Sequence, residues 1–341
     1  MGLKDLSRYS NLFDRLPPVK IVNAAKVLGS YHWSKISGNP RMAGLPFSIS
    51  IEPTTSCNLR CPECPSGLRS FTRPTGMIDM QLYEKIIAEV KSHVVHMLLY
   101  FQGEPYLHKG FFDLVNTAGK ARIFTATSTN AHYLSDDLAR QTVESGLDKL
   151  IISIDGTTQE TYEQYRIGGS LEKVISGTEN IIHWKRKLKS KTPYVVFQYL
   201  VVKPNEHQVN DVEQLANSLG VDEVLFKTAQ IYDFENGSDL IPSIDKYSRY
   251  QQKDDGSFKL KNELLNQCWK MWHSCVITWD GKVVPCCFDK DASHPMGDLK
   301  VQSFKEIWFG EKYQAFRQAI LRSRSEIDIC KNCSEGTKVW A

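Results

Sequence analysis

Residues 47–64 read FSISIEPTTSCNLRCPEC, in which an apolar alternation leads into three closely spaced cysteines. Apolar residues at every second position predict a short strand. The run Cys57-x3-Cys61-x2-Cys64 then lies on the loop that leaves this strand. Thiolates are soft ligands that select iron–sulfur clusters or zinc. A cluster of four irons held by three thiolates keeps one iron open to another ligand, so the sequence predicts a chemically active metal centre there.

Six short β-branched runs alternate with helical patterns between Phe47 and Thr228. This alternation is typical of successive βα units and a parallel sheet. The predicted strands span residues 47–52, 96–101, 122–127, 149–154, 194–202 and 223–228. The predicted helices span residues 79–92, follow caps at Ser135 and Ser170, and span residues 207–219 before Gly220. Right-handed crossovers then allow an open doubly wound sheet or a partial barrel, and in both layouts active groups gather at the carboxyl ends of strands.

The regions that flank this core have a different character. Pro17-Pro18 precede a helical pattern that we expect to pack on the core as an extension, with a mobile arm as the alternative. Residues 233–259 are polar with little periodicity, which is typical of a linker or lid. The last segment carries a hairpin with Asp280-Gly281 as its turn, a helix over residues 303–323, and six of the nine cysteines. We therefore divide the chain into residues 1–45, 46–235, 236–264 and 265–341.

Composition and charge bound the class of protein. The 341 residues are 41% hydrophobic, enough to bury a core, and the formal net charge is +3. No stretch reaches the roughly 18 apolar residues of a membrane span, and residues 1–15 lack the apolar core of a signal peptide. We therefore expect a cytosolic protein with no membrane partner, whose clustered cysteines bind metal rather than form disulfides. The basic run at residues 185–189 is interpreted as a solvated helix face, so nucleic acid is not an expected partner.

The cysteine spacing after the first strand of a six-unit βα core resembles the radical S-adenosylmethionine family, over residues 45–228. The resemblance implies a partial (βα)6 barrel and a [4Fe-4S] cluster on Cys57, Cys61 and Cys64 with one open iron site. In that family the open iron binds S-adenosylmethionine, and one electron cleaves it to a 5'-deoxyadenosyl radical. The resemblance also implies an electron donor such as flavodoxin or ferredoxin.

Further positions match those from which the family holds S-adenosylmethionine. Gln102-Gly103-Glu104-Pro105 resembles the G-G-E-P element that receives the methionine ammonium, with Gln102 in place of the first glycine. Glycine permits close backbone approach, and a carboxylate accepts from a cation. The positions that match contacts to the ribose and carboxylate are Ser128, Asn130, Ser153 and Asp155. Each of the four is also an ordinary cap or turn residue, but their recurrence at strand ends favours cofactor binding. Glu63 departs from the aromatic residue often found before the third cysteine.

The C-terminal cysteines resemble the family's auxiliary-cluster extension, called SPASM or, in its shortened form, Twitch. The matching pattern is Cys268-x12-Gly281-x4-Cys286, followed after a gap by Cys330-x2-Cys333. A full SPASM domain has seven cysteines for two clusters, so the resemblance here implies one auxiliary [4Fe-4S] cluster, held by Cys268, Cys286, Cys330 and Cys333. Cys275 and Cys287 are left over, and either could replace a ligand or be a buried structural thiol. Because Cys287 directly follows a ligand, alternation turns it to the opposite side, where it is a candidate catalytic hydrogen donor.

The resemblance implies an enzyme that abstracts hydrogen from a substrate C–H bond. Of the possible reactions, we expect modification of a peptide or protein side chain, and oxidation of a small sugar-like alcohol is a close second. Other readings stay open. The first is a structural zinc loop with His93, His96 or His108 as fourth ligand, and the second is a zinc ribbon in the C-terminal segment. The third is a non-catalytic protein whose two clusters hold structure or carry electrons.

Overall fold

The computed structural model describes Leu12 and residues 15–336 of the chain. The chain divides into two compact units, each assembled from separate stretches. The first unit comprises Met1–Ser56, Phe71–Ala126 and Leu264–Ala341, and the second comprises Cys57–Ser70 and Thr127–Glu263. Residues 1–11, 13 and 14, at the start of the predicted 1–45 extension, lie outside the described residues. Within the described part, no helix combines the length and apolar character needed to cross a membrane.

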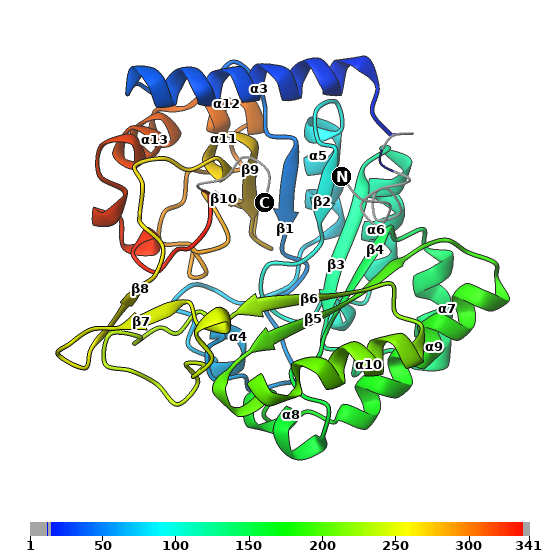
Figure 1. Ribbon diagram of the computed structural model, residues 1–341. Helices are drawn as coiled ribbons and strands as arrows, with labels where there is room; N and C mark the ends of the chain where they lie inside the picture. Colours follow the sequence, from blue (N-terminus) through cyan, green and yellow to red (C-terminus); the bar gives the residue numbers. More distant parts are fainter. Residues whose placement is uncertain (1–11, 13–14, 337–341) are drawn as a thin grey trace. The chain divides into compact units, whose positions relative to one another are not determined.

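A mostly parallel sheet forms the centre of the first unit (Figure 1). Its strands are β1 (Ser48–Ile51), β2 (His96–Leu98), β3 (Phe124–Thr129), β9 (Ser274–Ile277), β10 (Lys282–Val284) and β11 (Gly297–Asp298), in the spatial order β11-β10-β9-β1-β2-β3. β1 pairs in parallel with both β2 and β9, so Ser48 lies opposite His96 and Ser274. β9 and β10 form the predicted antiparallel hairpin. Its turn residue Gly281 has a φ of 86°, in the left-handed region that favours glycine.

The helices of the first unit begin either at side-chain caps or at positions without one. They are α3 (Pro18–Ser37), α5 (Met80–Val90), α6 (Phe111–Lys120), α11 (Lys270–His273), α12 (Phe304–Phe309) and α13 (Glu311–Ser323), with the 3-10 turns η1 (Pro105–Leu107), η4 (Arg324–Glu326) and η5 (Asp328–Cys330). The Asp79 side chain accepts hydrogen bonds from two backbone amides at the start of α5. The prediction of one helix over residues 303–323 is wrong. Gly310 adopts an extended backbone, with ψ of 164°, and separates α12 from α13.

The second unit contains the remaining βα elements. Its strands are β4 (Lys149–Ser153), β5 (Tyr194–Val201), β6 (Glu223–Thr228) and the end of β3, and its helices are α4 (Pro65–Leu68), α7 (Asp136–Glu144), α8 (Gln159–Tyr165), α9 (Leu171–Lys187) and α10 (Val209–Leu219), with the 3-10 turns η2 (Lys203–Gln208) and η3 (Asp245–Tyr247). β4, β5 and β6 pair in parallel. Ser135 and Ser170 cap α7 and α9 as predicted, and Gly220 ends α10. All six predicted parallel strands are present, and the α/β fold class is confirmed.

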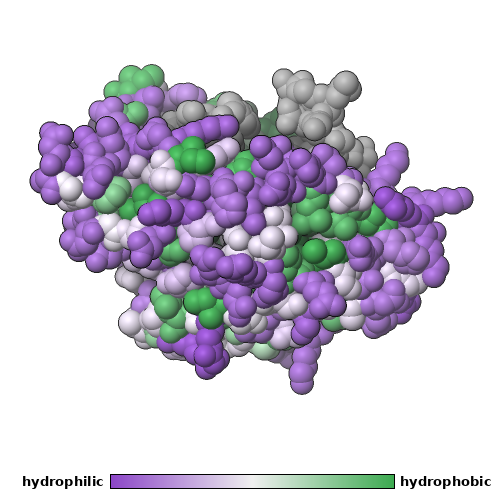
Figure 2. All heavy atoms as spheres, turned by 60° about the horizontal axis from the view of Figure 1, so that its bottom comes forward, coloured by the Kyte–Doolittle hydropathy of each residue, from purple (hydrophilic) through white to green (hydrophobic). Residues whose placement is uncertain are grey.

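The sequence patterns did not predict two features of the fold. The segment read as an aperiodic linker or lid contains the antiparallel hairpin β7 (Tyr250–Gln252) and β8 (Phe258–Leu260). On α3, Val27 is buried, whereas Val19 and Val22 are exposed, so the helix buries a narrower apolar face than its pattern indicated. On the face shown in Figure 2, hydrophilic residues predominate and hydrophobic residues form smaller patches between them.

Candidate functional site

The loop of residues 57–64, here called the cysteine loop, begins the second unit directly after the stretch that follows β1. Cys61 is buried, and Cys57 and Cys64 are partly exposed. Cys64 occupies the N-cap position of α4. A Cβ at Gly67 on that short helix would lie 2.6 Å from the backbone nitrogen of Cys61, so only glycine lets the helix turn pack this closely on the loop. The backbone thereby fixes where the middle thiol lies.

Hydrogen-bond donors surround the sulfurs of the cysteine loop. The backbone N–H of Leu59 lies 3.5 Å from the Sγ of Cys57, and the Asn130 amide donates to the same sulfur from 3.9 Å. The Nη1 of Arg166 lies 3.7 Å from the Sγ of Cys61. Burial raises the pKa of the Cys61 thiol, and the Arg166 cation opposes that shift. Donors aimed at sulfur stabilise thiolates, so the residues present fit a thiolate-ligated iron–sulfur cluster.

Apolar side chains enclose the cysteine loop within the second unit. The buried members of this cluster are Leu59, Cys61, Tyr165, Val202, Ala229, Ile231, Ile241 and Tyr250. Cys57 and Cys64 pack against it, as do Phe258 and Leu260 of the β8 strand. Tyr250 stacks on Phe234 with ring centroids 4.7 Å apart, and its hydroxyl accepts from the backbone N–H of Ile231 at 2.8 Å. An apolar shell of this kind limits the access of water to a redox centre.

The four strand-end residues predicted to hold the cofactor all belong to the same unit as the cysteine loop. Ser128 lies within β3, Asn130 follows it, and Ser153 is the last residue of β4. All three are buried. The Asn130 side chain donates to the Oδ1 of Asn58 at 2.8 Å, in addition to its contact with Cys57. The structure therefore joins the end of β3 to the cysteine loop directly.

Asp155, predicted to bind the cofactor, has two protein partners in the structure. Its carboxylate is fully buried, and Oδ1 accepts from the backbone N–H of Leu200 at 2.7 Å. Oδ2 accepts from the Nε of Arg166 at 2.5 Å. Burial raises the pKa of the Asp155 carboxyl, which Arg166 opposes. Asp155 thus orients Arg166 toward Cys61, and sequence reasoning missed Arg166 because no spacing rule connects it to the cysteines.

The Gly103-Glu104 element belongs to the first unit and packs on the backbone that leads into the cysteine loop. Gly103 has a φ of 75°, and a Cβ there would lie 2.3 Å from the carbonyl oxygen of Thr54. The backbone N–H of Glu104 donates to the carbonyl oxygen of Ser56 at 2.7 Å. The Glu104 carboxylate is buried and accepts from the N–H of Tyr106 at 3.2 Å. The close approach explains why glycine is required here, as the sequence predicted.

The C-terminal thiol site, meaning Cys268, Cys286, Cys330 and Cys333, assembles within the first unit. Cys268, Cys330 and Cys333 are buried, and Cys286 is partly exposed. Burial and the neighbouring thiols of Cys268 and Cys333 raise the pKa of Cys330 to about 12. Burial likewise raises the pKa of Cys286, with Cys268 and Cys333 among its charged neighbours. The structure therefore brings the four predicted ligands into one neighbourhood.

The two leftover thiols of this segment differ in their surroundings. Cys275 on β9 is buried, and its charged and hydrogen-bonding neighbours are Arg317 and Tyr313. Cys287 is exposed, and its charge acts on both Cys286 and Cys333. Cys287 is thus the neighbour of the C-terminal thiol site, and Cys275 has core partners of its own. Among the described residues, no three Cys, His, Asp or Glu side chains converge closely enough to hold a single metal ion.

One arginine, one backbone N–H and a close glycine contact complete the C-terminal thiol site. The Nη2 of Arg324 donates to the Sγ of Cys333 at 3.1 Å, and the N–H of Glu335 donates to the same sulfur at 3.3 Å. A Cβ at Gly336 would lie 2.5 Å from the Sγ of Cys268. Sulfurs that accept charged and backbone donors suit an iron–sulfur cluster here also.

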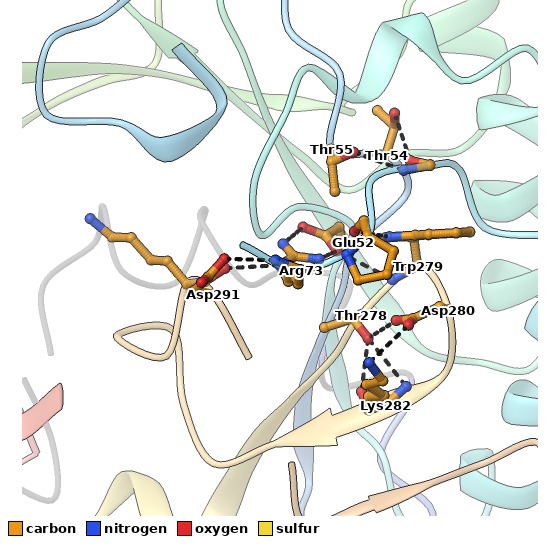
Figure 3. A network of polar contacts seen from close by, with 12 residues as sticks. Glu52, Thr54, Thr55, Arg73, Thr278, Trp279, Asp280, Lys282 and Asp291 are labelled. Carbon is orange, nitrogen blue, oxygen red and sulfur yellow. Dashed lines mark hydrogen bonds and ion pairs between the residues drawn. The ribbon is translucent and has the colours of Figure 1, made fainter. Parts of the chain in front are cut away.

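A buried polar network ties the hairpin next to the C-terminal thiol site to the end of β1 (Figure 3). Arg73 donates from both Nη atoms to the two carboxylate oxygens of Glu52, at 2.8 and 2.6 Å, and both side chains are almost completely buried. The Nε of Arg73 donates to the carbonyl oxygen of Lys290, and its backbone N–H donates to Asp291. The N–H of Trp279 donates to Glu52. The segments on both sides of Cys286-Cys287 are therefore fixed to one buried ion pair, which sequence reasoning missed.

Two family models match the chain. The model of the radical SAM superfamily matches residues 51–216, and that of SPASM, an iron-sulfur cluster-binding domain, matches residues 268–334. The first covers the cysteine loop and the strand ends that follow it. The second covers the C-terminal thiol site.

Curated relatives and solved structures agree with these models. The chain is 25% identical over 319 residues to the tungsten-containing aldehyde ferredoxin oxidoreductase cofactor-modifying protein of Pyrococcus furiosus, covering 84% of this chain and 86% of the relative. It is 22% identical over 291 residues to the S-adenosyl-L-methionine-dependent 2-deoxy-scyllo-inosamine dehydrogenase of Niallia circulans, covering 84% and 92%. The fold matches Streptococcus suis SuiB bound to precursor peptide SuiA with a TM-score of 0.60 at 14% identity, covering 89% of this chain and 72% of SuiB. The chain belongs to the radical SAM superfamily and carries a C-terminal SPASM domain.

Proposed function

We propose that this radical SAM enzyme abstracts a hydrogen atom from a carbon of a hydroxylated small molecule and oxidises that carbon. The observation that supports the radical chemistry is the cysteine loop itself, and the substrate class is supported separately by the relatives. Its three thiols have donors aimed at two of their sulfurs, lie in an apolar shell and stand next to an Arg166 guanidinium fixed by Asp155. These features suit a reducible cluster with the carboxylate of a cofactor beside it.

Each residue of the first site has a proposed part. Cys57, Cys61 and Cys64 hold a [4Fe-4S] cluster with an open iron site. Arg166 offers a planar fork of donors that suits the carboxylate of S-adenosylmethionine, and Asp155 acts through Arg166. The chemistry that the bound groups supply is one-electron cleavage of S-adenosylmethionine at this site and one-electron exchange at the auxiliary cluster.

The remaining polar residues are proposed to orient S-adenosylmethionine. The buried Glu104 carboxylate accepts from its ammonium, and Gly103 lets the backbone carry that carboxylate close to the stretch before Cys57. Ser128, Asn130 and Ser153 offer hydroxyl and amide groups to its ribose. The apolar cluster around Tyr250 keeps water from the reactive carbon radical.

The C-terminal thiol site is proposed to hold one auxiliary [4Fe-4S] cluster on Cys268, Cys286, Cys330 and Cys333. Cys287 is exposed beside it and is proposed to face the substrate. Oxidation of an alcohol carbon needs an acceptor for the hydroxyl proton, and Cys287 is proposed to take that part, because a hydrogen donor there would return the substrate radical to its starting state. The electron needed at the first cluster is proposed to come from a flavodoxin or ferredoxin.

The substrate class rests on how much of each relative the chain covers. The relatives named for modifying a cofactor and for dehydrogenating 2-deoxy-scyllo-inosamine are matched over most of their own length. Because of this coverage, we now favour a small-molecule substrate, whereas the sequence alone slightly favoured a peptide. Modification of a peptide side chain is the second candidate, because the fold also matches SuiB with its precursor peptide.

Transfer of deuterium tests the proposed function. The reconstituted protein is reduced anaerobically with dithionite in the presence of S-adenosylmethionine and pools of perdeuterated small molecules or peptides. We expect 5'-deoxyadenosine, methionine and transfer of one deuterium to 5'-deoxyadenosine from a hydroxylated small molecule. Transfer only from peptides would select the second candidate, and no 5'-deoxyadenosine with any pool would contradict both.

A further inference from the structure

The positively charged side chain of Arg324 is buried among thiols. Its side chain is 1% exposed, and the charges that act on it are those of Cys268, Cys333 and Cys330. A guanidinium stays charged in proteins, and burial of a charge is costly unless an opposite charge compensates it. Ligating thiolates would provide that opposite charge. The burial of Arg324 is therefore explained when the neighbouring cysteines carry negative charge.

Backbone carbonyl oxygens and thiol sulfurs hold the Arg324 guanidinium, which also has a side-chain hydrogen bond with Cys330. Nη1 donates to the carbonyl oxygen of Gln267 at 2.9 Å, and Nη2 donates to the carbonyl oxygen of Glu335 at 2.6 Å. Nη2 also donates to the Sγ of Cys333 at 3.1 Å. The backbone N–H of Arg324 donates to the Asn266 side chain at 2.9 Å, which anchors η4. The guanidinium is thus held between the residues preceding Cys268 and those following Cys333.

Lys270 brings a second cation to the same site from α11. Its Nζ lies 2.6 Å from the Oε2 of Glu335, and the charges of Cys287 and Cys286 also act on it. The segment that carries Glu335 is itself fixed, because the N–H of Trp269 donates to the carbonyl oxygen of Gly336 at 2.7 Å. Two cations and one carboxylate therefore surround the sulfurs in a defined arrangement.

We propose that Arg324 and Lys270 raise the reduction potential of the auxiliary cluster, with Arg324 acting as a positioning residue on the sulfur of Cys333 and Glu335 moderating Lys270. The inference rests on the proposed function, in which the C-terminal thiol site holds an iron–sulfur cluster. Reduction adds negative charge to a cluster, and nearby cations and charged donors to sulfur stabilise the reduced form more than the oxidised form. A raised potential suits an enzyme that removes electrons from its substrate. The inference therefore ties this site to oxidation.

Redox titration of the auxiliary cluster alone tests the proposal. The full-length chain with Cys57, Cys61 and Cys64 all changed to Ala retains only the C-terminal thiol site. Iron and sulfide are measured first, and an absence of iron in this parent protein would contradict the proposed cluster itself rather than the role of Arg324. The reduced cluster is then followed by electron paramagnetic resonance at poised potentials.

Substitutions with opposite expected signs separate an electrostatic role from a structural one. Arg324→Gln should lower the ratio of reduced to oxidised cluster at a fixed potential by about tenfold. Arg324→Lys should recover part of that loss, and Lys270→Gln should lower the ratio by a smaller factor. Glu335→Gln should raise it. Lys300→Gln, at an exposed position of the same unit, is the matched control and should change the ratio least.

The outcomes decide the proposal even where one variant loses its cluster. Unchanged ratios in Arg324→Gln and Lys270→Gln with full iron content would overturn it. Where Arg324→Gln fails to retain iron, Arg324→Lys and Glu335→Gln decide. A higher ratio in Glu335→Gln supports the proposal, and a ratio equal to that of Lys300→Gln overturns it.

Discussion

The cysteine loop and the C-terminal thiol site gather thiols in contrasting ways. The first places three thiols on one continuous stretch, residues 57–64, two of them partly exposed, with sulfur donors at 3.5 to 3.9 Å. The second collects four thiols from residues spread between 268 and 333, three of them buried, with a charged donor at 3.1 Å. We propose that the local loop suits a centre that exchanges its outer ligand, and that the tertiary assembly suits a centre whose ligands all come from the protein.

The surroundings of the two sites sharpen this contrast. Near the cysteine loop, the basic residue Arg166 is paired with the Asp155 carboxylate. At the C-terminal thiol site, Arg324 donates to backbone carbonyls and to sulfur, and Lys270 pairs with Glu335. The contrast predicts different responses when each site is damaged.

Loss of a ligand should have the largest effect and separate the two sites. Cys61→Ala should abolish cleavage of S-adenosylmethionine and leave roughly half the iron, because only the auxiliary cluster then remains. Cys330→Ala should spare cleavage and block product formation. Both results are measured by chromatography of 5'-deoxyadenosine and product together with iron analysis.

Cys287→Ser is the matched control for the iron measurement, because Cys287 is exposed and adjacent to a proposed ligand. Its iron content should equal that of the wild type. Lost iron in this variant would make Cys287 a ligand in place of Cys268, and normal product formation by Cys330→Ala would remove the need for the second site.

Breaking the buried ion pair should have the next largest effect, on stability. Arg73→Met leaves the Glu52 carboxylate buried without its partner and should lower the free energy of unfolding by about 3–5 kcal/mol. The double variant with Glu52→Gln should recover part of this loss. Urea unfolding of the anaerobic apoprotein measures both.

The exposed pair Arg140 and Asp137, with N and O atoms 2.8 Å apart, is the matched control. Arg140→Met should change stability little, because solvent screens this pair. A loss in Arg73→Met no larger than in Arg140→Met would contradict the anchoring role of the network in Figure 3.

Removal of the cation at the cysteine loop should slow cofactor cleavage without emptying the site. We expect Arg166→Ala to lower the rate of 5'-deoxyadenosine formation by about 10–100-fold. Arg166→Lys keeps the charge and should mainly raise the KM for S-adenosylmethionine, because the planar fork is lost. Full activity of Arg166→Ala at low S-adenosylmethionine would show that the cation has no part in binding.

Acidification should produce the smallest effect, a loss of stability in the first unit. Burial lowers the pKa of His93 to about 4, from an ordinary value near 6.5, and its ring stacks on Phe304. As the pH falls below 6.5, His93 therefore binds a proton in the unfolded chain and stays neutral in the folded chain. Relative to its value above pH 6.5, the free energy of unfolding should be about 2 kcal/mol lower at pH 5.

His93→Phe keeps the stacking partner and removes the titrating group, so its stability should fall less between pH 7 and pH 5. The exposed His207 provides the control, with His207→Gln expected to follow the wild type. An identical acid response in His93→Phe and wild type would assign the pH dependence to other groups, such as the partly exposed His273, whose pKa burial also lowers.

Much of the fold was predictable because its signals are local. The six parallel strands, the caps Ser135 and Ser170, and the hairpin turn at Gly281 each follow from residues next to one another in the chain. The error at Gly310 has a physical reason, since a glycine inside a helical pattern can either continue the helix or end it. Tertiary context decided the outcome.

The basic residues of both sites could not be predicted in this way. Arg166 acts on a cysteine 105 residues away, and no periodicity or motif marks that distance. Arg324 is only nine residues from Cys333, yet its sequence context is that of an ordinary charged helix end. Whether an arginine is exposed or buried against sulfur depends on packing that the composition of the segment does not record.

Metal analysis followed by reduction separates an iron–sulfur enzyme from a zinc protein. The anaerobically purified protein is analysed for iron, sulfide and zinc and is then reduced with dithionite in the presence of S-adenosylmethionine. The account predicts a brown protein with about eight irons per chain, an electron paramagnetic resonance signal that S-adenosylmethionine changes, and release of 5'-deoxyadenosine. A colourless protein that contains zinc and does not respond to dithionite would contradict it.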